Sequence, residues 1–191
     1  AYEQGETFGQ LVQEGLLHPN LPAAFGDYRL YQHQVEAIRV GLQGKGFIVT
    51  SGTGSGKSLT YLATIFDYLF RLGANKQKGI KAILVYPMNA LINSQEEEIK
   101  KYESNFGNGF PITFMKYTGQ EKQDLRELVK EKKPDIILTN YMMLELIMTR
   151  DSESWLRESM RQHLKFLVFD ELHTYRGRQG ADVSMLIRRI Q

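Results

Sequence analysis

From Tyr31 onward, short apolar runs rich in β-branched and aromatic residues alternate with longer segments whose apolar residues recur at helical spacing. This alternation is typical of a parallel α/β sheet, in which each strand is followed by a helix. The predicted strands cover residues 47–50, 82–86, 112–115, 135–139 and 166–169. The predicted helices cover residues 31–42, 57–72, 89–102, 122–131 and 141–148. Because such sheets bind ligands outside the carboxyl ends of their strands, the residues that follow each strand are the candidate site residues.

A glycine-rich octet lies between the first predicted strand and the helix that follows it. Its residues are Ser51, Gly52, Thr53, Gly54, Ser55, Gly56, Lys57 and Ser58. The glycines allow successive backbone N–H groups to converge on an anion, and the start of the helix adds the positive end of its dipole. Lys57 would supply a charge for the β- and γ-phosphates, and the Ser58 hydroxyl would ligate Mg²⁺. The octet therefore predicts nucleotide binding. The strict pattern has glycine where Ser51 stands, which argues against the commonest P-loop kinases and GTPases.

Two carboxylates follow the last predicted strand. Asp170 and Glu171 come directly after the apolar run 166–169 and are followed by Leu172 and His173. Asp170 would hold Mg²⁺, and Glu171 would orient and deprotonate the attacking water, since only one of the two can face the metal. The alternative is that both acids begin a helix, where they favour its dipole. His173 would couple nucleotide to nucleic acid, or simply pack or face water.

These elements together resemble the DEAD/DEAH-box helicases of superfamily 2. Residues 170–173 are similar to the family's D-E-x-H box, residues 51–58 to its first motif, and residues 30–38 to its Q-motif region. Further similarities lie at residues 86–91 with Gln95, at 117–119 and at 138–144, and the segment after the box is similar to a bacterial branch of large helicases. The resemblance implies a RecA-like P-loop NTPase domain of the α/β class, with a central mostly parallel sheet flanked by helices. It also assigns Gln34 to adenine recognition.

The same resemblance gives the expected partners and domain organisation. It implies ATP and Mg²⁺ as cofactors, single-stranded nucleic acid as substrate, with DNA favoured over RNA, and a second RecA-like domain of the same parent chain. We expect residues 1–29 to form a helical extension and 30–191 the first motor domain. In this family the second domain carries the arginine fingers, each of which can raise turnover by about 10³–10⁵-fold. We therefore expect this stretch alone to bind ATP weakly, to hydrolyse it barely and to unwind nothing.

Several residues are candidates for nucleic-acid contact. A motor that moves along any sequence must contact the strand through its phosphates, and Thr118, Gly119, Thr139 and Asn140 have suitable donors. Ordinary turn and cap chemistry after strands is the alternative for these four. Arg176 and Arg178 would contact phosphate or form a salt-bridged hinge to the second domain. Trp155, Tyr141, Met142 and Met143 could stack on bases, although their helical spacing favours the core.

The bulk composition narrows the class without identifying a site. The 191 residues carry a formal net charge of +2, so any nucleic-acid surface must be local. The absence of cysteine excludes thiolate metal ligands and a cysteine nucleophile. No apolar run approaches the ~20 residues that span a bilayer, so we expect a cytoplasmic protein without a membrane partner.

Two other functions stay open: a duplex translocase of a restriction or defence system, and a nucleotide-binding scaffold that never hydrolyses ATP. A transporter-type ATPase would need a Leu-Ser-Gly-Gly-type signature, which the sequence lacks.

Overall fold

The structure is a computed structural model that describes residues 2–44, 47–49 and 56–170, with the backbone alone described for 47–49. The chain divides into two compact units. One comprises residues 1–45, 54–76 and 97–112, and the other comprises 46–53, 77–96 and 113–191. Each unit is described by itself below.

The unit that contains the N-terminus combines a short hairpin-like sheet with helices. Strands β1 (Gln4–Thr7) and β2 (Arg29–Tyr31) pair antiparallel. The helices are α1 (Phe8–Gln13), α2 (Leu21–Phe25), α3 (Gln32–Leu42) and α4 (Lys57–Leu72), together with the second half of α5 (Asn89–Phe106). Residues 1–29 therefore hold two helices and also a strand, and the domain boundary at residue 30 stays a prediction.

Helix α4 is the central element of this unit. It begins after Gly56, ends at Gly73, whose φ of +81° stops the helix, and buries most of its residues. Around Phe66 gather aromatic rings from α2 and α5, with ring centroids 5.1 Å away for Phe25 and 6.1 Å for Tyr102. The buried carboxylate of Asp67 accepts from the backbone N–H of His18 at 2.7 Å and from Arg71 at 2.9 Å. This carboxylate therefore fixes the N-terminal segment against α4.

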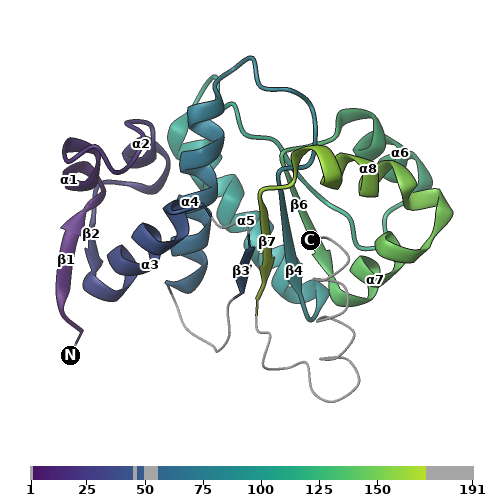
Figure 1. The fold of residues 1–191 in the computed structure, drawn as a ribbon, viewed down its shortest axis with the longest axis horizontal. Helices are drawn as coiled ribbons and strands as arrows, with labels where there is room; N and C mark the ends of the chain where they lie inside the picture. Colours follow the sequence, from purple (N-terminus) through teal and green to yellow (C-terminus); the bar gives the residue numbers. More distant parts are fainter. Residues whose placement is uncertain (1, 45–46, 50–55, 171–191) are drawn as a thin grey trace. The chain divides into compact units, whose positions relative to one another are not determined.

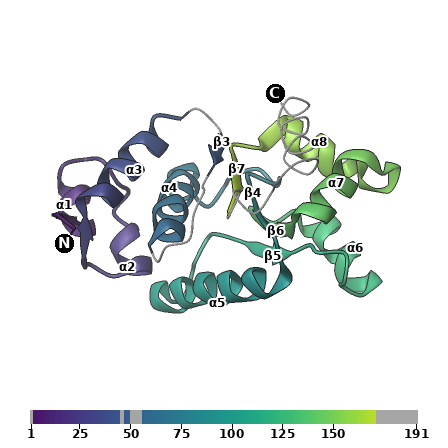
Figure 2. The ribbon, with the colours of Figure 1, turned by 90° about the horizontal axis from the view of Figure 1, so that it is seen from below.

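The second unit contains a five-stranded parallel sheet. Its strands are β3 (Phe47–Val49), β4 (Ala82–Tyr86), β5 (Phe114–Lys116), β6 (Ile136–Asn140) and β7 (Phe166–Phe169). They lie in the order β3-β7-β4-β6-β5, and every pairing is parallel (Figure 2). The prediction of a parallel α/β sheet is confirmed.

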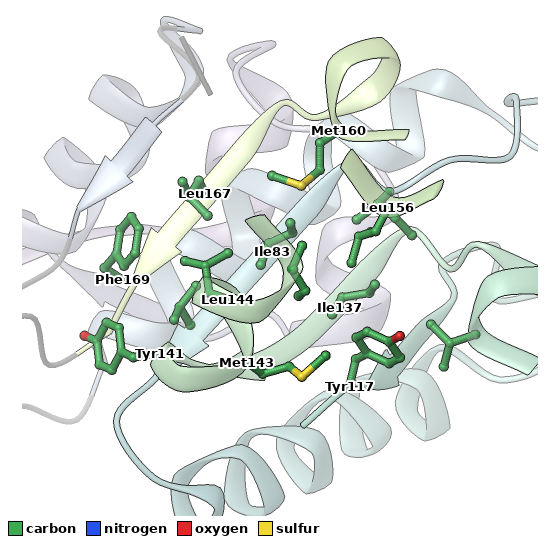
Figure 3. Packing of buried hydrophobic residues seen from close by; sticks show 14 residues of the cluster. Ile83, Tyr117, Ile137, Tyr141, Met143, Leu144, Leu156, Met160, Leu167 and Phe169 are labelled. Atoms are coloured by element: carbon green, nitrogen blue, oxygen red, sulfur yellow. The ribbon is translucent and has the colours of Figure 1, made fainter. Parts of the chain in front are cut away.

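Helices α7 (Tyr141–Thr149) and α8 (Ser154–His163) pack on one face of this sheet (Figures 1 and 3). Leu144 of α7 and Leu156 of α8 lie fully buried against residues such as Ile83 and Leu167, which face the helices from the strands. Between the two helices, residues 151–153 form a single 3₁₀ turn, and α6 (Gln123–Lys132) adds Val129 to the same core. Every residue of β4 and β7 is buried, as expected for parallel strands covered on both faces.

Most element bounds lie within one residue of the sequence prediction, but α5 ends at Phe106, four residues later than predicted. Strand β5 begins at Phe114, two residues later than predicted. Just before it, the Thr113 N–H donates to the Asp135 carboxylate at 3.0 Å, and the Asp135 N–H donates to the Thr113 hydroxyl at 2.8 Å. Both of these bonds between the two segments are from backbone to side chain. The sequence analysis did not foresee β1, β2 or α8. Among the described helices, none has both the length and the apolar character needed to cross a membrane.

Candidate nucleotide and nucleic-acid sites

The strand that leads to the glycine-rich loop lies beside the strand that carries Asp170. Strands β3 and β7 pair in parallel register, with Ile48 opposite Val168 and Val49 opposite Phe169. The end of β3 and the end of the strand that carries Asp170 therefore lie side by side at the same edge of the sheet.

The backbone of Asp170 is fixed at this edge by two hydrogen bonds. Its N–H donates to the carbonyl of Val85 at 2.9 Å, and its carbonyl accepts from the Tyr141 hydroxyl at 2.9 Å. The Tyr141 ring stacks on Phe169 with the two planes 9° apart, and Figure 3 shows both rings at the end of β7. The start of α7 thus holds the tip of β7.

In the other unit, the described residues of the predicted nucleotide site are Gln34, Gly56, Lys57 and Ser58. Gly56 has φ +97°, a left-handed conformation that L side chains rarely adopt. A Cβ at this position would lie 2.5 Å from Gln34 Nε2, which donates to the Gly56 carbonyl at 3.4 Å. The Gln34 Oε1 accepts from the Tyr31 N–H at 2.9 Å. Only glycine fits this close approach, and it brings the predicted adenine-recognising amide to the end of the phosphate loop.

A hollow of about 380 Å³ opens beside these residues. It is lined by Gln4, Tyr28, Arg29, Tyr31, Gln34, Gly56, Ser58, Leu59, Glu98 and Tyr102. Its volume lies in the range of about 300–1,000 Å³ that is usual for small-molecule sites. Burial and the nearby Glu98 raise the pKa of Tyr28 to about 12, so its hydroxyl stays protonated at neutral pH. A polar, partly aromatic hollow beside the first residues of α4 suits a nucleotide. Lys57, at the first position of α4, is exposed.

The remaining predicted nucleotide and coupling residues, and two of the predicted nucleic-acid contacts, lie outside the described residues. They are Ser51, Gly52, Thr53, Gly54, Ser55, Glu171, His173, Arg176 and Arg178. Their roles stay predictions.

At the carboxyl edge of the sheet, Asn140 joins three chain segments. Its Oδ1 accepts from the Met143 N–H at 2.7 Å and so caps α7. Its Nδ2 donates to Asn89 Oδ1 at 3.0 Å and to the Thr118 carbonyl at 3.3 Å. The cap chemistry weighed for Asn140 is therefore present, and the same side chain also ties the loop after β5 to the start of α5.

The loop after β5 presents several hydrogen-bond donors, and one carboxylate accepts from them. Glu121 Oε1 accepts from the N–H groups of Thr118 at 2.6 Å and of Gly119 at 3.2 Å. Glu121 Oε2 accepts from the Thr118 hydroxyl. Gly119 has φ +89°, which lets its N–H turn towards the same point as that of Thr118. The loop is thus a small anion-binding concavity that holds an anion of its own chain.

Thr139 differs from the other predicted contact residues because its side chain is fully buried. Its hydroxyl donates to the Tyr117 carbonyl at 2.6 Å, which joins β6 to the segment after β5. In this structure the hydroxyl therefore serves the sheet, and a contact between Thr139 and nucleic acid stays a prediction.

A second hollow, of about 580 Å³, lies at this edge. It is lined by Asn89, Asn93, Lys116, Thr118, Gln120, Glu121, Lys122, Asp124 and Leu125. The Lys116 ammonium donates to Asn93 Oδ1 at 3.0 Å and lies 3.8 Å from Glu96. Both lysines of this lining lie near the donor loop, so the surface combines amide, hydroxyl and cationic groups.

The aromatic and methionine residues that could either stack on bases or pack in the core differ in their burial. Tyr141 and Met143 are core residues at 6% and 1% exposure, and Trp155 packs partly buried against the same core. Met142 is 75% exposed, so it is not part of the core. Lys81, one of the basic residues near the start of β4, is 3% exposed and forms an ion pair with Asp135 at 3.0 Å.

Glu121 and Asn89 are the residues that the sequence analysis missed at this edge. A signal existed for Glu121, because Thr118 and Glu121 have the Thr-x-x-Glu spacing of a capping box. Asn89 lies within residues 86–91, which are similar to a family motif, but the pattern did not give its contact with Asn140, which is distant in the sequence. The aromatic lining of the nucleotide-side hollow, Tyr28 and Tyr102, was missed for the same reason.

Comparison with known proteins places this geometry in a family. The family model described as DEAD/DEAH box helicase matches residues 31–191. The ATP-dependent helicase YprA of Bacillus subtilis is 30% identical over 162 residues, which cover 85% of this chain and 20% of that protein. The ATP-dependent helicase HRQ1 of Saccharomyces cerevisiae is 29% identical over 179 residues, which cover 94% of this chain and 15% of that protein.

Solved structures agree with the fold. The DUF1998 helicase MrfA bound to DNA and AMPPNP has a TM-score of 0.76 and 26% identity, with coverage of 99% of this chain and 25% of its own. Mss116p bound to single-stranded RNA and AMP-PNP, at 20% identity, has a TM-score of 0.79 and supports the fold alone; it covers 100% of this chain and 38% of that one. The expected RecA-like fold is confirmed.

The chain spans about a fifth or less of the length of the two helicase relatives named above. The family model nevertheless covers most of it, from the segment that contains Gln34, through the glycine-rich octet, to Asp170 and beyond. The chain belongs to the DEAD/DEAH box helicase family.

Proposed function

We propose that this chain is the ATP-binding motor domain of an ATP-dependent helicase that acts on single-stranded nucleic acid. The pairing of β3 with β7 is the observation that carries the proposal, since the end of β3, which precedes the glycine-rich octet in the sequence, lies beside the strand that carries Asp170. A nucleotide site of this class needs both elements around one triphosphate.

Each residue of the nucleotide site has a distinct role in this proposal. Residues 51–56 would surround the phosphates with backbone N–H groups, and Lys57 would supply the cation. Ser58 and Asp170 would hold Mg²⁺, which neutralises charge on the β- and γ-phosphates. Glu171 would accept the proton of the attacking water. Gln34 would offer adenine the second N–H and the second acceptor position of its amide, because its Nε2 already donates to the Gly56 carbonyl and its Oε1 accepts from the Tyr31 N–H.

The nucleic-acid strand would run over the carboxyl edge of the sheet unit. Thr118 lines a hollow there together with two lysines, Lys116 and Lys122, and Asn140 bonds to the Thr118 carbonyl. Gly119 follows Thr118 in the same loop. Contacts of this kind read phosphates and carry no sequence information, as a motor requires. The structural relative MrfA is bound to DNA and the relative Mss116p to RNA, and the higher identity to MrfA supports DNA.

Unwinding would require more than this chain. We infer that a second RecA-like domain of the same protein closes on the nucleotide and that His173, Arg176 and Arg178 take part in coupling or strand contact. Under this proposal the 191 residues bind ATP weakly and do not unwind by themselves.

A pair of substitutions in the whole protein tests the proposal. Lys57→Ala should abolish binding of a fluorescent ATP analogue, because it removes the phosphate cation at the start of α4. Glu171→Gln should keep that binding and stop turnover, and single-stranded DNA should stimulate the ATPase of the unsubstituted protein. Unchanged nucleotide affinity in Lys57→Ala would refute the phosphate-loop assignment, and stimulation by RNA alone would refute the preference for DNA.

A further inference from the structure

The donors of the loop after β5 already hold an anion. Three of them, the N–H groups of Thr118 and Gly119 and the Thr118 hydroxyl, converge on the single carboxylate of Glu121. A phosphate presents the same kind of acceptor, with oxygens that accept charge-assisted hydrogen bonds from N–H and O–H groups. The loop therefore cannot give these donors to a phosphate while Glu121 keeps them.

From this competition we propose that Glu121 occupies the position of a nucleic-acid phosphate and is displaced when the strand binds. The inference rests on the proposed function, because it assigns the phosphate subsite of that same strand surface. It adds an internal competitor that lowers the affinity of the surface for single strands.

The charges around the hollow agree with this assignment. Its lining contains two lysines, Lys116 and Lys122, and two carboxylates, Glu121 and Asp124. While Glu121 accepts from the loop donors, the two positive and two negative side chains of the lining balance each other. When Glu121 moves away from the donors, a negative charge leaves this part of the lining, which favours the entry of a phosphate.

The loop also keeps its shape without Glu121. Asn140 Nδ2 holds the Thr118 carbonyl at 3.3 Å, and the Tyr117 N–H donates to the Leu138 carbonyl at 2.9 Å. The Gln120 N–H donates to the Thr118 hydroxyl oxygen at 3.3 Å. These bonds involve neither oxygen of Glu121, so the donors can stay oriented when the carboxylate leaves.

The test measures binding of a fluorescent single-stranded oligonucleotide to the whole protein by anisotropy. Glu121→Ala and Glu121→Gln should each tighten binding, the first by about fivefold, since a protein whose competent state is partly blocked has a proportionally weaker apparent affinity. A carboxylate that only shaped the loop would have the opposite effect, because its removal would weaken binding.

Two further variants separate competition from a general change of charge. Glu127→Gln removes the same charge from α6, where Glu127 accepts from Gln123 at 3.1 Å and contacts no loop donor, and it should leave the affinity within about twofold. Thr118→Val, added to Glu121→Ala, should lose most of the gain in oligonucleotide affinity, because it removes the Thr118 hydroxyl, one of the donors that Glu121→Ala makes available. Equal gains in Glu121→Ala and Glu127→Gln, or no effect of Thr118→Val on the gain, would overturn the proposal.

The outcome also distinguishes this inference from the proposed function. Binding by the unsubstituted protein that Glu121→Ala leaves unchanged or weakens refutes the role of Glu121 alone. Failure of the unsubstituted protein and of Glu121→Ala to bind any single strand refutes the proposed function, and this inference with it.

Discussion

Replacing Glu153 with alanine should destabilise the chain by about 3–5 kcal/mol, the range typical when one partner of a buried pair is removed. The carboxylate is 2% exposed, and its two oxygens lie 2.9 and 2.7 Å from the Tyr117 hydroxyl. Arg126 Nη2 lies 3.2 Å from the first of these oxygens. Without the acceptor, the buried Tyr117 hydroxyl costs about 1–3 kcal/mol, and the lost charged hydrogen bond costs about 1.5–3 kcal/mol. Since the Arg126 side chain is 26% exposed, we expect a loss of stability in the lower half of the range of about 3–5 kcal/mol.

Urea unfolding followed by tryptophan fluorescence measures this change directly. Trp155 is the single tryptophan of the 191 residues, and its ring meets the Tyr117 ring at 6.1 Å and 78°. The matched control is Glu158→Ala on α8, where an exposed carboxylate pairs with exposed Arg161 and should contribute far less, because water and salt screen the pair. A Glu153→Ala variant as stable as the Glu158→Ala control would refute the argument that this buried cluster holds the segment after β5.

Two other perturbations follow from the same geometry. Burial, followed by the bond to Glu153, raises the pKa of Tyr117 to about 12, so its contribution to stability is complete below the unfolded pKa of about 10 and is lost as the pH rises towards 12. Tyr117→Phe should make the fall in urea midpoint across this window shallower, without abolishing it, because the pKa of Tyr28 is also raised to about 12; an unchanged slope would contradict the assignment. Gly56→Ala should weaken binding of a fluorescent ATP analogue by about tenfold or more, because its Cβ would meet Gln34 Nε2 at 2.5 Å. Gly73→Ala is the control, since it has a similar φ of +81° but nothing within 4 Å of the added Cβ, and equal losses of nucleotide binding in both variants would show that backbone strain alone is responsible.

The parts of the fold that the sequence predicted well are those whose local pattern and tertiary environment agree. Residues 82–86 and 166–169 are continuous apolar runs, and both became fully buried strands with those bounds. Helix α4 has the predicted bounds because Gly56 and Gly73 stand at its two ends. Here burial on both faces and glycine stops are visible in the sequence itself.

The missed elements lack such local signals. Strand β1 consists of Gln4, Gly5, Glu6 and Thr7, whose polar residues show no alternation, and it forms because β2 offers it a partner 22 residues beyond its end. Helix α8 buries only Leu156, Ser159 and Met160, a stripe too narrow to stand out among charged residues. Lys81 stands close to Lys76 and Lys78 in the sequence, a basic pattern that favours an exposed surface, yet Asp135, 54 residues away, makes it a buried cation. In each case the deciding partner is distant in the sequence.

In the candidate site too, local features are visible in the sequence and contacts between distant residues are not. The start of α7 shows this. Asn140 and Tyr141 are adjacent in the sequence, but their side chains bond to different strand ends, Asn140 to the Thr118 loop and Tyr141 to the Asp170 carbonyl. Sequence pattern gave each of these residues separately, as a contact or core candidate, because caps and strand ends have local signatures. Their joint arrangement depends on β6 lying between β4 and β5, which pattern alone cannot supply. The loop that contains Thr118 and the backbone of Asp170 are therefore bonded to neighbouring residues of one helix turn, which would give the proposed strand contact and the proposed metal ligand a short physical connection.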